Sequence, residues 1–401
     1  MAFFLREDNP MQKKSVLFIN GHLNAGGCER SLIDLLRHLD YSSYQVDLLL
    51  LEGLGDYYDE LPPEVHVHLY SLEHAFGPFW KCMTDAWKNK DLFSFGFRLA
   101  YCLSSLFGRR MLRLSRGLFS ECAGKYDAIV AYRQGICTDL AAYAFSGERK
   151  ISWWHYGEFR FSSKQTIMIE KAFRNFDNLV TVSEICAHMI REHIPSVDEK
   201  IRVIPNILDS DELFRKASSY EPPSKGSGVV KIVSVGRLSP EKNFLLCVDA
   251  AEELLRAGMQ FTWSIIGDGA EFKEIQERII KYGLEKHIVL LGRRTNPYPW
   301  ILSADMLVHP SLVESQGLSI LEAMALNTPV ICVKSAGPME YIVDGENGFL
   351  VEASPAMIAD RIMWISNHPD LRIRVAQLAK QTVMKFSAGR VVHEFTQVIN
   401  G

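Results

Sequence analysis

The sequence lacks the features that mark several well-defined protein classes. Its eight cysteines include no Cys-x2-Cys pair and no Cys/His cluster at zinc spacing, so we expect reduced thiols and no structural zinc site. No apolar run reaches the roughly eighteen residues that a membrane span needs. The formal net charge is -4, which argues against a protein that binds nucleic acid through its bulk charge.

Two N-terminal signals are also missing. The first fourteen residues, MAFFLREDNPMQKK, carry Arg6, Glu7 and Asp8 directly after a short apolar patch, so we expect no signal peptide and a cytoplasmic protein. The first strand pattern is not followed by the G-x-G-x-x-G fingerprint of dinucleotide-binding proteins. A Rossmann-type dehydrogenase is therefore the least favoured class of enzyme.

What the sequence does contain is enough apolar material for two domains. It has 401 residues, of which 47% are hydrophobic, and this length exceeds what one core usually supports. Buried-strand patterns alternate with amphipathic helical patterns, which predicts an α/β protein with parallel sheets. The stretch SSYEPPSKGSG at 218–228 is rich in Pro, Ser and Gly and marks a boundary between the domains.

The segment at 305–333, DMLVHPSLVESQGLSILEAMALNTPVICV, predicts a strand, a loop, a helix and a second strand. Glu314 in the loop and Glu322 in the helix flank Gly317. The unpaired amide hydrogens at the start of the helix favour a phosphate. Two carboxylates repel a phosphate, so they are better suited to accept hydrogen bonds from hydroxyls. A ligand that carries both phosphates and many hydroxyls is a nucleotide sugar.

At these residues the sequence resembles a known family. SLVESQGLSILEAMALNTPVI is similar to the Glu-x7-Glu segment of glycosyltransferase family 4, a family of retaining transferases with the two-domain GT-B fold. The resemblance implies that Glu314 holds the transferred sugar and that Glu322 holds the ribose. It also places the donor against the residues between them, Ser315, Gln316, Gly317 and Leu318. Many members of the family have an aromatic residue where this chain has Gln316.

The resemblance also implies a division of the chain. It predicts two Rossmann-like, doubly wound domains that face each other across a cleft. We expect an acceptor-binding domain over 1–208 and a nucleotide-sugar-binding domain over 209–385, with a linker at about 209–228. We expect a C-terminal helix over 386–401 that crosses back to the first domain, as it does in GT-B enzymes.

A second group of donor-binding candidates follows the first strand pattern of the second domain. In GRLSPEKN, Arg237 follows the strand and Lys242 stands at a helix start, where two cations form a clamp for a diphosphate. The alternative is a pair of solvated surface cations. The segment is similar to the family's G-R-L-x-x-x-K-N loop. The resemblance further places Gly267 in a G-x-G loop of the donor site and Arg293 near the nucleobase.

The first domain offers candidates where its strand patterns end. Gly26 and Gly27 lack side chains and let a ligand approach the start of a helix. Their loop is similar to the family's GG-x-E-R loop, which implies that they bind the donor; the alternative is a glycine turn that only packs helix on strand. Arg133 follows a strand, at the edge where parallel sheets bind ligands. His155 follows the next strand, where the family commonly has a histidine close to the reacting sugar; a lone histidine is more often structural. We assign Arg133 and His155 to the acceptor side.

The segment at 81–125 differs from the rest of the chain. It carries nine Lys or Arg and three Asp or Glu, although the chain as a whole is acidic. Aromatic residues and leucines alternate with these charges, which is typical of a helix that lies on an anionic membrane surface. This interpretation predicts peripheral contact with the inner face of the membrane. The alternative is a pair of helices that packs on the sheet and keeps a solvated basic face.

Together these features predict a retaining glycosyltransferase that moves a sugar from a nucleotide-diphosphate sugar, and especially a UDP-sugar, to a hydroxyl of a glycan or a polyprenyl-diphosphate-linked acceptor. Its catalytic residues would be Glu314, His155, Arg237 and Lys242, and its pathway cell-envelope, capsular or exopolysaccharide synthesis. We expect no cofactor and no metal, because we recognise no Asp-x-Asp pair of the kind that metal-dependent transferases use. The alternatives are an inactive nucleotide-sugar-binding partner of another transferase and a GT-B sugar-nucleotide epimerase. A phosphorylase is disfavoured, because no site for its cofactor lysine or inorganic phosphate is found.

Overall fold

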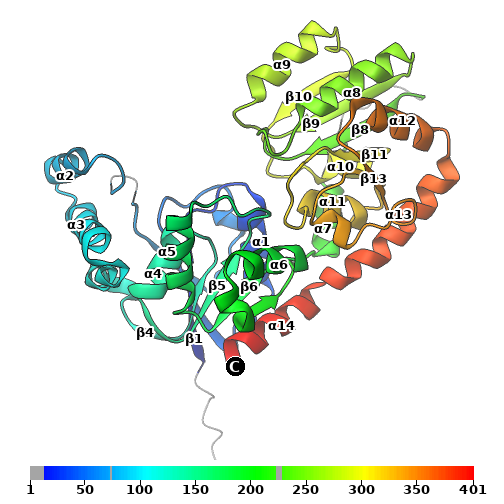
Figure 1. Cartoon of the computed structure of the whole chain (residues 1–401). Helices are drawn as coiled ribbons and strands as arrows, with labels where there is room; N and C mark the ends of the chain where they lie inside the picture. The colour runs from blue at the N-terminus through cyan, green and yellow to red at the C-terminus, as the bar shows by residue number, and fades with distance from the viewer. Residues whose placement is uncertain (1–12, 73–74, 223–227) are drawn as a thin grey trace, which may run out of the picture.

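The computed structural model describes residues 13–72, 75–222 and 228–401, and it contains two α/β domains, each built on a parallel sheet with helices packed against it (Figure 1). Most of the N-terminal stretch that argues against a signal peptide lies outside the described residues, as do residues 223–227 of the predicted linker. None of the described helices is long and apolar enough to cross a lipid bilayer.

The first domain is built on a seven-stranded sheet in the order β3-β2-β1-β4-β5-β6-β7, and all neighbouring strands are parallel. The central strands are apolar on both faces because helices cover both. The strands are β1 (Lys14–Asn20), β2 (Tyr44–Leu50), β3 (Val65–Leu69), β4 (Lys125–Ala131), β5 (Ser146–Trp154), β6 (Asn178–Thr181) and β7 (Ile201–Val203). The helices are α1 (Gly27–Arg37), α2 (Phe79–Lys88), α3 (Leu92–Phe107), α4 (Ile136–Tyr143), α5 (Ser163–Phe173) and α6 (Glu184–His193).

The second domain has a six-stranded parallel sheet in the order β10-β9-β8-β11-β12-β13. Its strands are β8 (Val230–Val235), β9 (Phe261–Ile266), β10 (Ile288–Gly292), β11 (Met306–His309), β12 (Val330–Val333) and β13 (Phe349–Val351). Its helices are α7 (Ser210–Ala217), α8 (Leu245–Arg256), α9 (Phe272–Lys281), α10 (Tyr298–Ser303), α11 (Leu318–Ala325), α12 (Pro355–Ser366) and α13 (Pro369–Val383).

Both sheets are doubly wound. The strand order reverses between two neighbouring strands, β1 and β4 in the first sheet and β8 and β11 in the second. Open parallel sheets bind ligands outside the carboxyl ends of the strands at such a point. The predicted class, an α/β protein with two doubly wound domains, is confirmed.

One boundary of the prediction is wrong. The linker expected at 209–228 begins with α7, whose Leu213 and Ala217 are buried in a core cluster of the second domain. Asp209 caps this helix by accepting a hydrogen bond from Glu212 N at 3.0 Å. The helix escaped notice because the Pro-, Ser- and Gly-rich stretch that follows it dominates the local composition.

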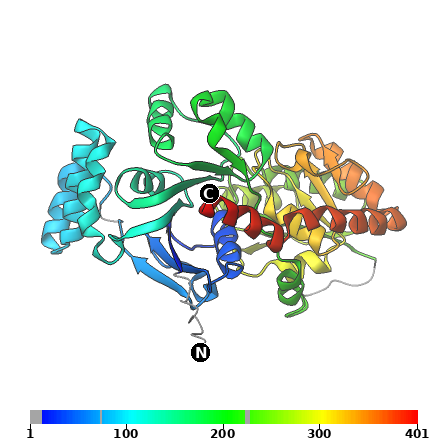
Figure 2. The ribbon, with the colours of Figure 1, turned by 90° about the horizontal axis from the view of Figure 1, so that it is seen from below.

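The last helix, α14 (Ala388–Asn400), runs back from the second domain to the first (Figures 1 and 2). Its apolar side, including Val391 and Phe395, is buried in the core of the first domain. The ring centroid of Phe395 lies 5.9 Å from that of Phe18 in β1 and 5.4 Å from that of Trp153 in β5. The C-terminal helix therefore completes the core of the N-terminal domain.

We expect Phe395→Ala to lower the free energy of unfolding of the first domain by about 3 kcal/mol, because the truncation leaves a cavity beside two aromatic rings. The control is His393→Ala, which changes an exposed side chain of the same helix. Urea unfolding followed by tryptophan fluorescence measures both variants. Equal unfolding midpoints would contradict a structural role for this helix in the first domain.

Candidate functional site

The candidate site lies where the two domains meet at the starts of α1 and α11. A Cβ added to Gly27, the first residue of α1, would lie 3.4 Å from Cδ1 of Leu318, the first residue of α11. A Cβ added to Gly157, in the loop after β5, would come within 2.8 Å of the backbone of Glu314. A larger residue at Gly157 would push this backbone away. The loop after β5 therefore lies directly against the loop that carries Glu314.

The starts of both helices present backbone amides to this junction. Gly26 is the N-cap of α1, and Gly317 is the N-cap of α11 with a φ of 80°, a left-handed conformation that favours glycine. Neither N-cap offers a side-chain hydrogen bond. Ser315 precedes Gly317 in the loop before α11, and its backbone packs closely on Gly337. The amide hydrogens at these helix starts are thus suited to an anion.

Glu314 is held by two side chains of its own domain. Its Oε1 accepts a hydrogen bond from Lys242 Nζ at 2.5 Å and lies 2.6 Å from His309 Nε2. Glu314 and His309 are buried, and Lys242 is partly buried. His309 Nδ1 in turn lies 3.3 Å from Ser319 Oγ of α11. Lys242 follows β8 and His309 ends β11, so the pairing of these neighbouring strands brings the three groups together.

This pairing stabilises the charge on Glu314. Burial alone would raise the pKa of the carboxyl, but attraction to Lys242 and His309 and hydrogen bonds from both outweigh it and lower the pKa to about 2. Both partners contact Oε1, and no described residue donates a hydrogen bond to Oε2. A carboxylate with one oxygen occupied and the other free can accept a hydrogen bond from a sugar hydroxyl.

Glu322 lies in a different environment on the same helix. Its Oε1 accepts a hydrogen bond from Tyr298 OH at 3.2 Å, and the residue lines a hollow of about 20 Å³ between α1, α7 and α11. Burial raises the pKa of Glu322 to about 7; Asp34 adds to the rise, and Tyr298 and Arg30 oppose it. The hollow has room for about one water molecule. Contact between Glu322 and a ribose therefore requires side chains or domains to move.

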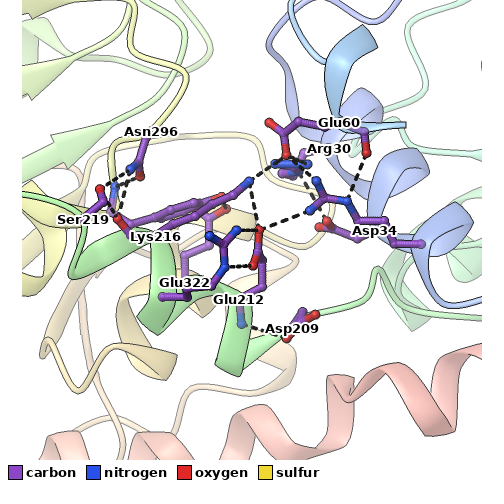
Figure 3. A network of polar contacts seen from close by, with 12 residues as sticks. Arg30, Asp34, Glu60, Asp209, Glu212, Lys216, Ser219, Asn296 and Glu322 are labelled. Atoms are coloured by element: carbon purple, nitrogen blue, oxygen red, sulfur yellow. Dashed lines mark hydrogen bonds and ion pairs between the residues drawn. The ribbon is translucent and has the colours of Figure 1, made fainter. Parts of the chain in front are cut away.

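A network of ion pairs surrounds this hollow and joins the two domains (Figure 3). Glu60, in the 3₁₀ turn η1 (Tyr58–Glu60) of the first domain, pairs with Arg30 at 2.9 Å and with Lys216 of α7 at 2.7 Å. Arg37 of α1 pairs with Glu60 at 2.9 Å and with Glu212 of α7 at 3.3 Å. A charged cluster therefore holds α1 against α7, beside the connection at 204–209 between β7 and α7, which we call the hinge.

Another contact joins the domains at α6. Glu340, in the 3₁₀ turn η5 (Pro338–Glu340) of the second domain, accepts hydrogen bonds from Ile185 N at 2.6 Å and Glu184 N at 3.2 Å. These amides belong to the first turn of α6, where backbone donors lack partners within the helix. A carboxylate of one domain thus caps a helix of the other.

Gln316 contacts the hinge. Its Oε1 accepts hydrogen bonds from Asn206 N at 3.0 Å and Asn206 Nδ2 at 2.6 Å, and both residues are buried. Ser31 of α1 donates to Asn206 Oδ1 at 2.5 Å and lies 2.6 Å from Tyr132 OH. Gln316, which the resemblance places against the donor, therefore begins a buried polar chain that crosses into the first domain. Its Nε2 has no partner among the described residues.

The other donor-side candidates lie around the same junction. Arg237 is exposed and forms no ion pair with the residues that the structure describes. Gly267 packs on the loop that carries Arg237, because a Cβ there would collide with the carbonyl oxygen of Gly236. Arg293 extends to the first domain and pairs with Asp56. In this conformation Arg293 joins the domains, and its place near a nucleobase stays a prediction.

His155 follows β5 and lies among aromatic rings. Its ring centroid is 4.9 Å from that of Tyr132 and 6.1 Å from that of Trp153, on which it stacks. Burial lowers the pKa of His155 to about 3, and a backbone hydrogen bond with Tyr132 partly opposes this shift, so the imidazole is neutral near pH 7. Its Nε2 has no partner among the residues described. This nitrogen is buried, so the neutral imidazole can form a hydrogen bond with a ligand only after the groups that cover it move.

Arg133 belongs to a charged group at the carboxyl ends of β1, β2 and β4. Its Nη1 lies 3.0 Å from His22 Nε2 and 3.9 Å from carboxylate oxygens of both Glu29 and Glu52. Two carboxylates therefore offset the single guanidinium. Such a group offers hydrogen bonds of both kinds and little net attraction for an anion.

The described residues include no cluster of three or more His, Cys, Asp or Glu side chains arranged to hold a metal ion. An Asp-x-Asp spacing does occur, at Asp209 and Asp211, and the sequence analysis overlooked it. Asp209 caps α7, and its Oδ2 lies 3.1 Å from His38 Nε2 of the first domain. This carboxylate has a structural role at the hinge, and a metal-independent reaction stays a prediction.

The sequence analysis missed two site residues, His309 and Tyr298. His309 is the last residue of β11 and precedes Glu314 by five positions. The rule that selects Arg133, a polar residue at the carboxyl end of a parallel strand, also selects His309. Tyr298 begins the short helix α10 and gives no comparable signal, because its contact with Glu322 arises only in the folded domain.

The arrangement of the two domains is that of known glycosyltransferases. HepE from Anabaena, solved in complex with UDP and glucose, has a TM-score of 0.71 over 96% of this chain and 99% of that chain, with 19% identity. A TarM variant from S. aureus, solved with UDP among its ligands, has a TM-score of 0.71 over 97% of this chain and 100% of that chain, with 14% identity. At these identities the likeness shows the fold alone, and it confirms the predicted GT-B class.

Family models assign the chain to a family as well as to a fold. The model described as Glycosyltransferase Family 4 matches residues 25–212, and the model described as Glycosyl transferases group 1 matches residues 220–382. The chain therefore belongs to the glycosyltransferases of the family 4 type.

Curated relatives share part of this chain. They include the putative glycosyltransferase EpsD of Bacillus subtilis, 30% identical over 42% of this chain and 44% of the relative. The poly(ribitol-phosphate) alpha-N-acetylglucosaminyltransferase of Staphylococcus aureus is 28% identical over 42% and 35%. The lipopolysaccharide core biosynthesis glycosyltransferase LpsE of Rhizobium meliloti is 29% identical over 57% and 65%. The match spans less than two thirds of each relative, so it does not carry over their substrates.

The opposite pKa shifts of the two glutamates predict opposite effects of one substitution. The folded-state pKa of Glu322, about 7, lies above its ordinary value of 4.5, so this carboxyl contributes stability below pH 4.5 that is lost as the pH rises through 7. Glu322→Gln should therefore raise the free energy of unfolding at pH 8 by about 2 kcal/mol and change it little at pH 5.

The pKa of Glu314, about 2, lies below 4.5, so its contribution to stability is present above pH 4.5 and lost as the pH falls through 2. Glu314→Gln should lower the free energy of unfolding at both pH values.

Urea unfolding of the parent protein and the two variants at pH 5 and pH 8 measures these effects without any ligand. Each variant is the control for the other, because both remove one buried carboxylate from the same segment. Effects of the same sign at pH 8 would contradict the environments described here.

Proposed function

We propose that the protein is a retaining glycosyltransferase that moves a sugar from a nucleotide-diphosphate sugar, specifically a UDP-sugar, to an acceptor hydroxyl. The observation that carries this proposal is the setting of Glu314. One of its oxygens is held by Lys242 and His309, the open start of α11 follows it, and the His155 loop of the other domain lies against it. UDP as the donor nucleotide is supported by HepE and the TarM variant, both solved with UDP.

In this proposal the leaving diphosphate lies at the start of α11, between the helix amides and two cations. The positive end of the helix dipole and the unpaired amide hydrogens attract the phosphate oxygens. The ammonium group of Lys242 has three hydrogens, of which Glu314 takes one, so the others can face the diphosphate. Arg237 is exposed and can bind two phosphate oxygens at once. Their charge would stabilise the diphosphate as it departs.

The acceptor hydroxyl would approach from the first domain, near Gly27 and His155. The bond between the anomeric carbon and the donor phosphate oxygen breaks, and the acceptor oxygen forms the new bond on the same face. The acceptor proton passes to the departing phosphate oxygen, and the products are a nucleoside diphosphate and a glycoside. Attack on the face that the diphosphate leaves retains the anomeric configuration. Glu314 would orient the sugar through Oε2 and stabilise positive charge at the anomeric carbon.

We propose a hydroxyl-rich acceptor from cell-envelope glycan synthesis, either a glycan or a polyprenyl-diphosphate-linked sugar. The names of LpsE and of the poly(ribitol-phosphate) transferase support this pathway. The group around Arg133 also supports it, because two carboxylates offset the one guanidinium and the group suits hydroxyls better than a further phosphate. Capsular and exopolysaccharide synthesis belong to the same class of pathway.

UDP and UDP-sugars are expected to raise the melting temperature of the protein in the presence of EDTA, because a ligand that binds only the folded state stabilises it by mass action. GDP, ADP and their sugar conjugates are the matched comparison. A thermal-shift series measures all of them under one set of conditions. A shift with guanine or adenine nucleotides alone would contradict the UDP assignment, and a shift that EDTA abolishes would contradict a metal-independent site.

Product analysis separates the transferase from its two alternatives. With the UDP-sugar that gives the shift, a transferase releases UDP, slowly to water and faster to an acceptor. An inactive partner binds the donor and leaves it unchanged. An epimerase changes the sugar and releases no UDP.

Lys242→Ala should lower kcat by about 30-fold to 1,000-fold, equivalent to about 2 to 4 kcal/mol of transition-state stabilisation, because it removes a cation from the leaving diphosphate and from Glu314. Lys334→Ala is the control, since Lys334 is an exposed cation of the same domain that pairs with Glu352. Steady-state UDP release measures both variants. Unchanged turnover of Lys242→Ala would refute the diphosphate clamp.

A further inference from the structure

The helices α2 and α3 form a hairpin that projects from the first domain, at the end away from the second domain (Figures 1 and 2). The 3₁₀ segment η2 (Arg109–Leu118) follows it and packs against α3. This region contains the basic, aromatic segment that the sequence analysis left open between a membrane surface and a packed helical pair.

One face of α3 is an ordinary packing face. Phe97 is fully buried, with its ring centroid 6.1 Å from that of Phe119. Phe93 lies 5.2 Å from Tyr70, which follows β3. These rings attach the hairpin to the body of the domain, as the packed-pair interpretation predicts for this face.

The opposite face carries two apolar rows that remain exposed. On α3, residues at intervals of seven stay on one side of the helix along its length of about 24 Å. They are 75%, 44% and 72% exposed: Leu92, Leu99 and Leu106. On α2, Trp80 and Trp87 have the same spacing and are 78% and 72% exposed. The ring of Trp87 lies 6.0 Å from that of Phe95, so Trp87 lies against α3.

Cations accompany these apolar rows. Five of them have exposed side chains: Lys81, Lys88, Lys90, Arg110 and Arg113. None of the five side chains forms an ion pair or a hydrogen bond with the part of the chain that the structure describes. The surface is thus apolar and cationic at once, on a chain whose formal net charge is -4.

We propose that this surface, which we call the hairpin surface, docks on an anionic phospholipid bilayer. Tryptophan rings and leucine side chains enter the boundary between headgroups and acyl chains, and lysine and arginine side chains pair with lipid phosphates. A second copy of the chain is a poorer occupant, because it would bring two sets of unpaired cations together. The docking proposal rests on the side chains of the hairpin surface alone and does not depend on the proposed transfer reaction.

The attachment of the hairpin gives docking a consequence for the candidate site. Arg109, just after α3, pairs at 3.5 Å with Asp139 of α4, the helix that begins directly after the Arg133 loop. The hairpin surface and the proposed acceptor side therefore belong to one rigid domain. Docking would therefore fix the orientation of the acceptor side relative to the lipid surface.

The test compares sedimentation of the full chain with vesicles of phosphatidylcholine alone and of equal parts phosphatidylglycerol and phosphatidylcholine. We expect binding to the anionic vesicles only. Trp80→Ser with Trp87→Ser, and separately Lys81→Gln with Lys88→Gln and Lys90→Gln, should each weaken binding about tenfold. The matched control, Ile373→Ser with Met384→Ser, removes side chains of 57% and 71% exposure from the second domain and should bind as the parent does.

Because the replaced side chains are exposed, we expect each variant to fold, and thermal melting checks this. No binding of the parent to anionic vesicles, or equal binding of the tryptophan variant, would overturn the proposal. Light scattering addresses the other occupant: a dimer of the parent that the tryptophan variant loses, without vesicle binding, would assign the surface to a second copy. None of these outcomes depends on donor binding or turnover.

Discussion

The geometry of the site depends on one buried carboxylate and its cation. An ionised carboxyl as buried as Glu314 is strongly destabilising without a partner, and Lys242 supplies that partner at 2.5 Å. The two residues are 72 positions apart and meet because β8 and β11 are neighbours in the sheet. The strand reversal of the second domain thus brings the charges of Glu314 and Lys242 together. Oε2 of Glu314, the amides at the start of α11 and Arg237 lie around this pair.

The elements and the donor side could largely be predicted because their signals are local. Runs of apolar residues mark strands that are buried on both faces, and polar residues directly after them lie at the carboxyl edge of the sheet. Arg133 and His155 follow from this rule, and so does His309, to which the rule was not applied; Glu314 and Lys242 were predicted from the starts of helices. The failure at α7 has a different cause: eight helical residues beside a Pro-, Ser- and Gly-rich stretch were absorbed into that stretch.

The contacts between the domains could not be predicted, because no periodicity in the chain encodes how two separate cores are placed against each other. Gln316 shows this most clearly. The resemblance places it against the donor, and the structure pairs it with Asn206 at the hinge and links it to Ser31 and Tyr132. Arg293 is a similar case, since its partner Asp56 lies in the other domain.

These interdomain contacts occupy groups that the proposed function assigns to the donor. Arg293 is paired with Asp56, and the hollow beside Glu322 holds no more than about one water. A ligand can shift the equilibrium between the conformation with these contacts and one without them only by as much as its binding free energy differs between the two. If the donor binds at the predicted residues, contacts between the domains are exchanged for contacts with the nucleotide, and the ion pairs of Glu60 and Glu212 set part of the free energy of that exchange. Salt screens partly exposed ion pairs, so the free energy of that exchange depends on ionic strength.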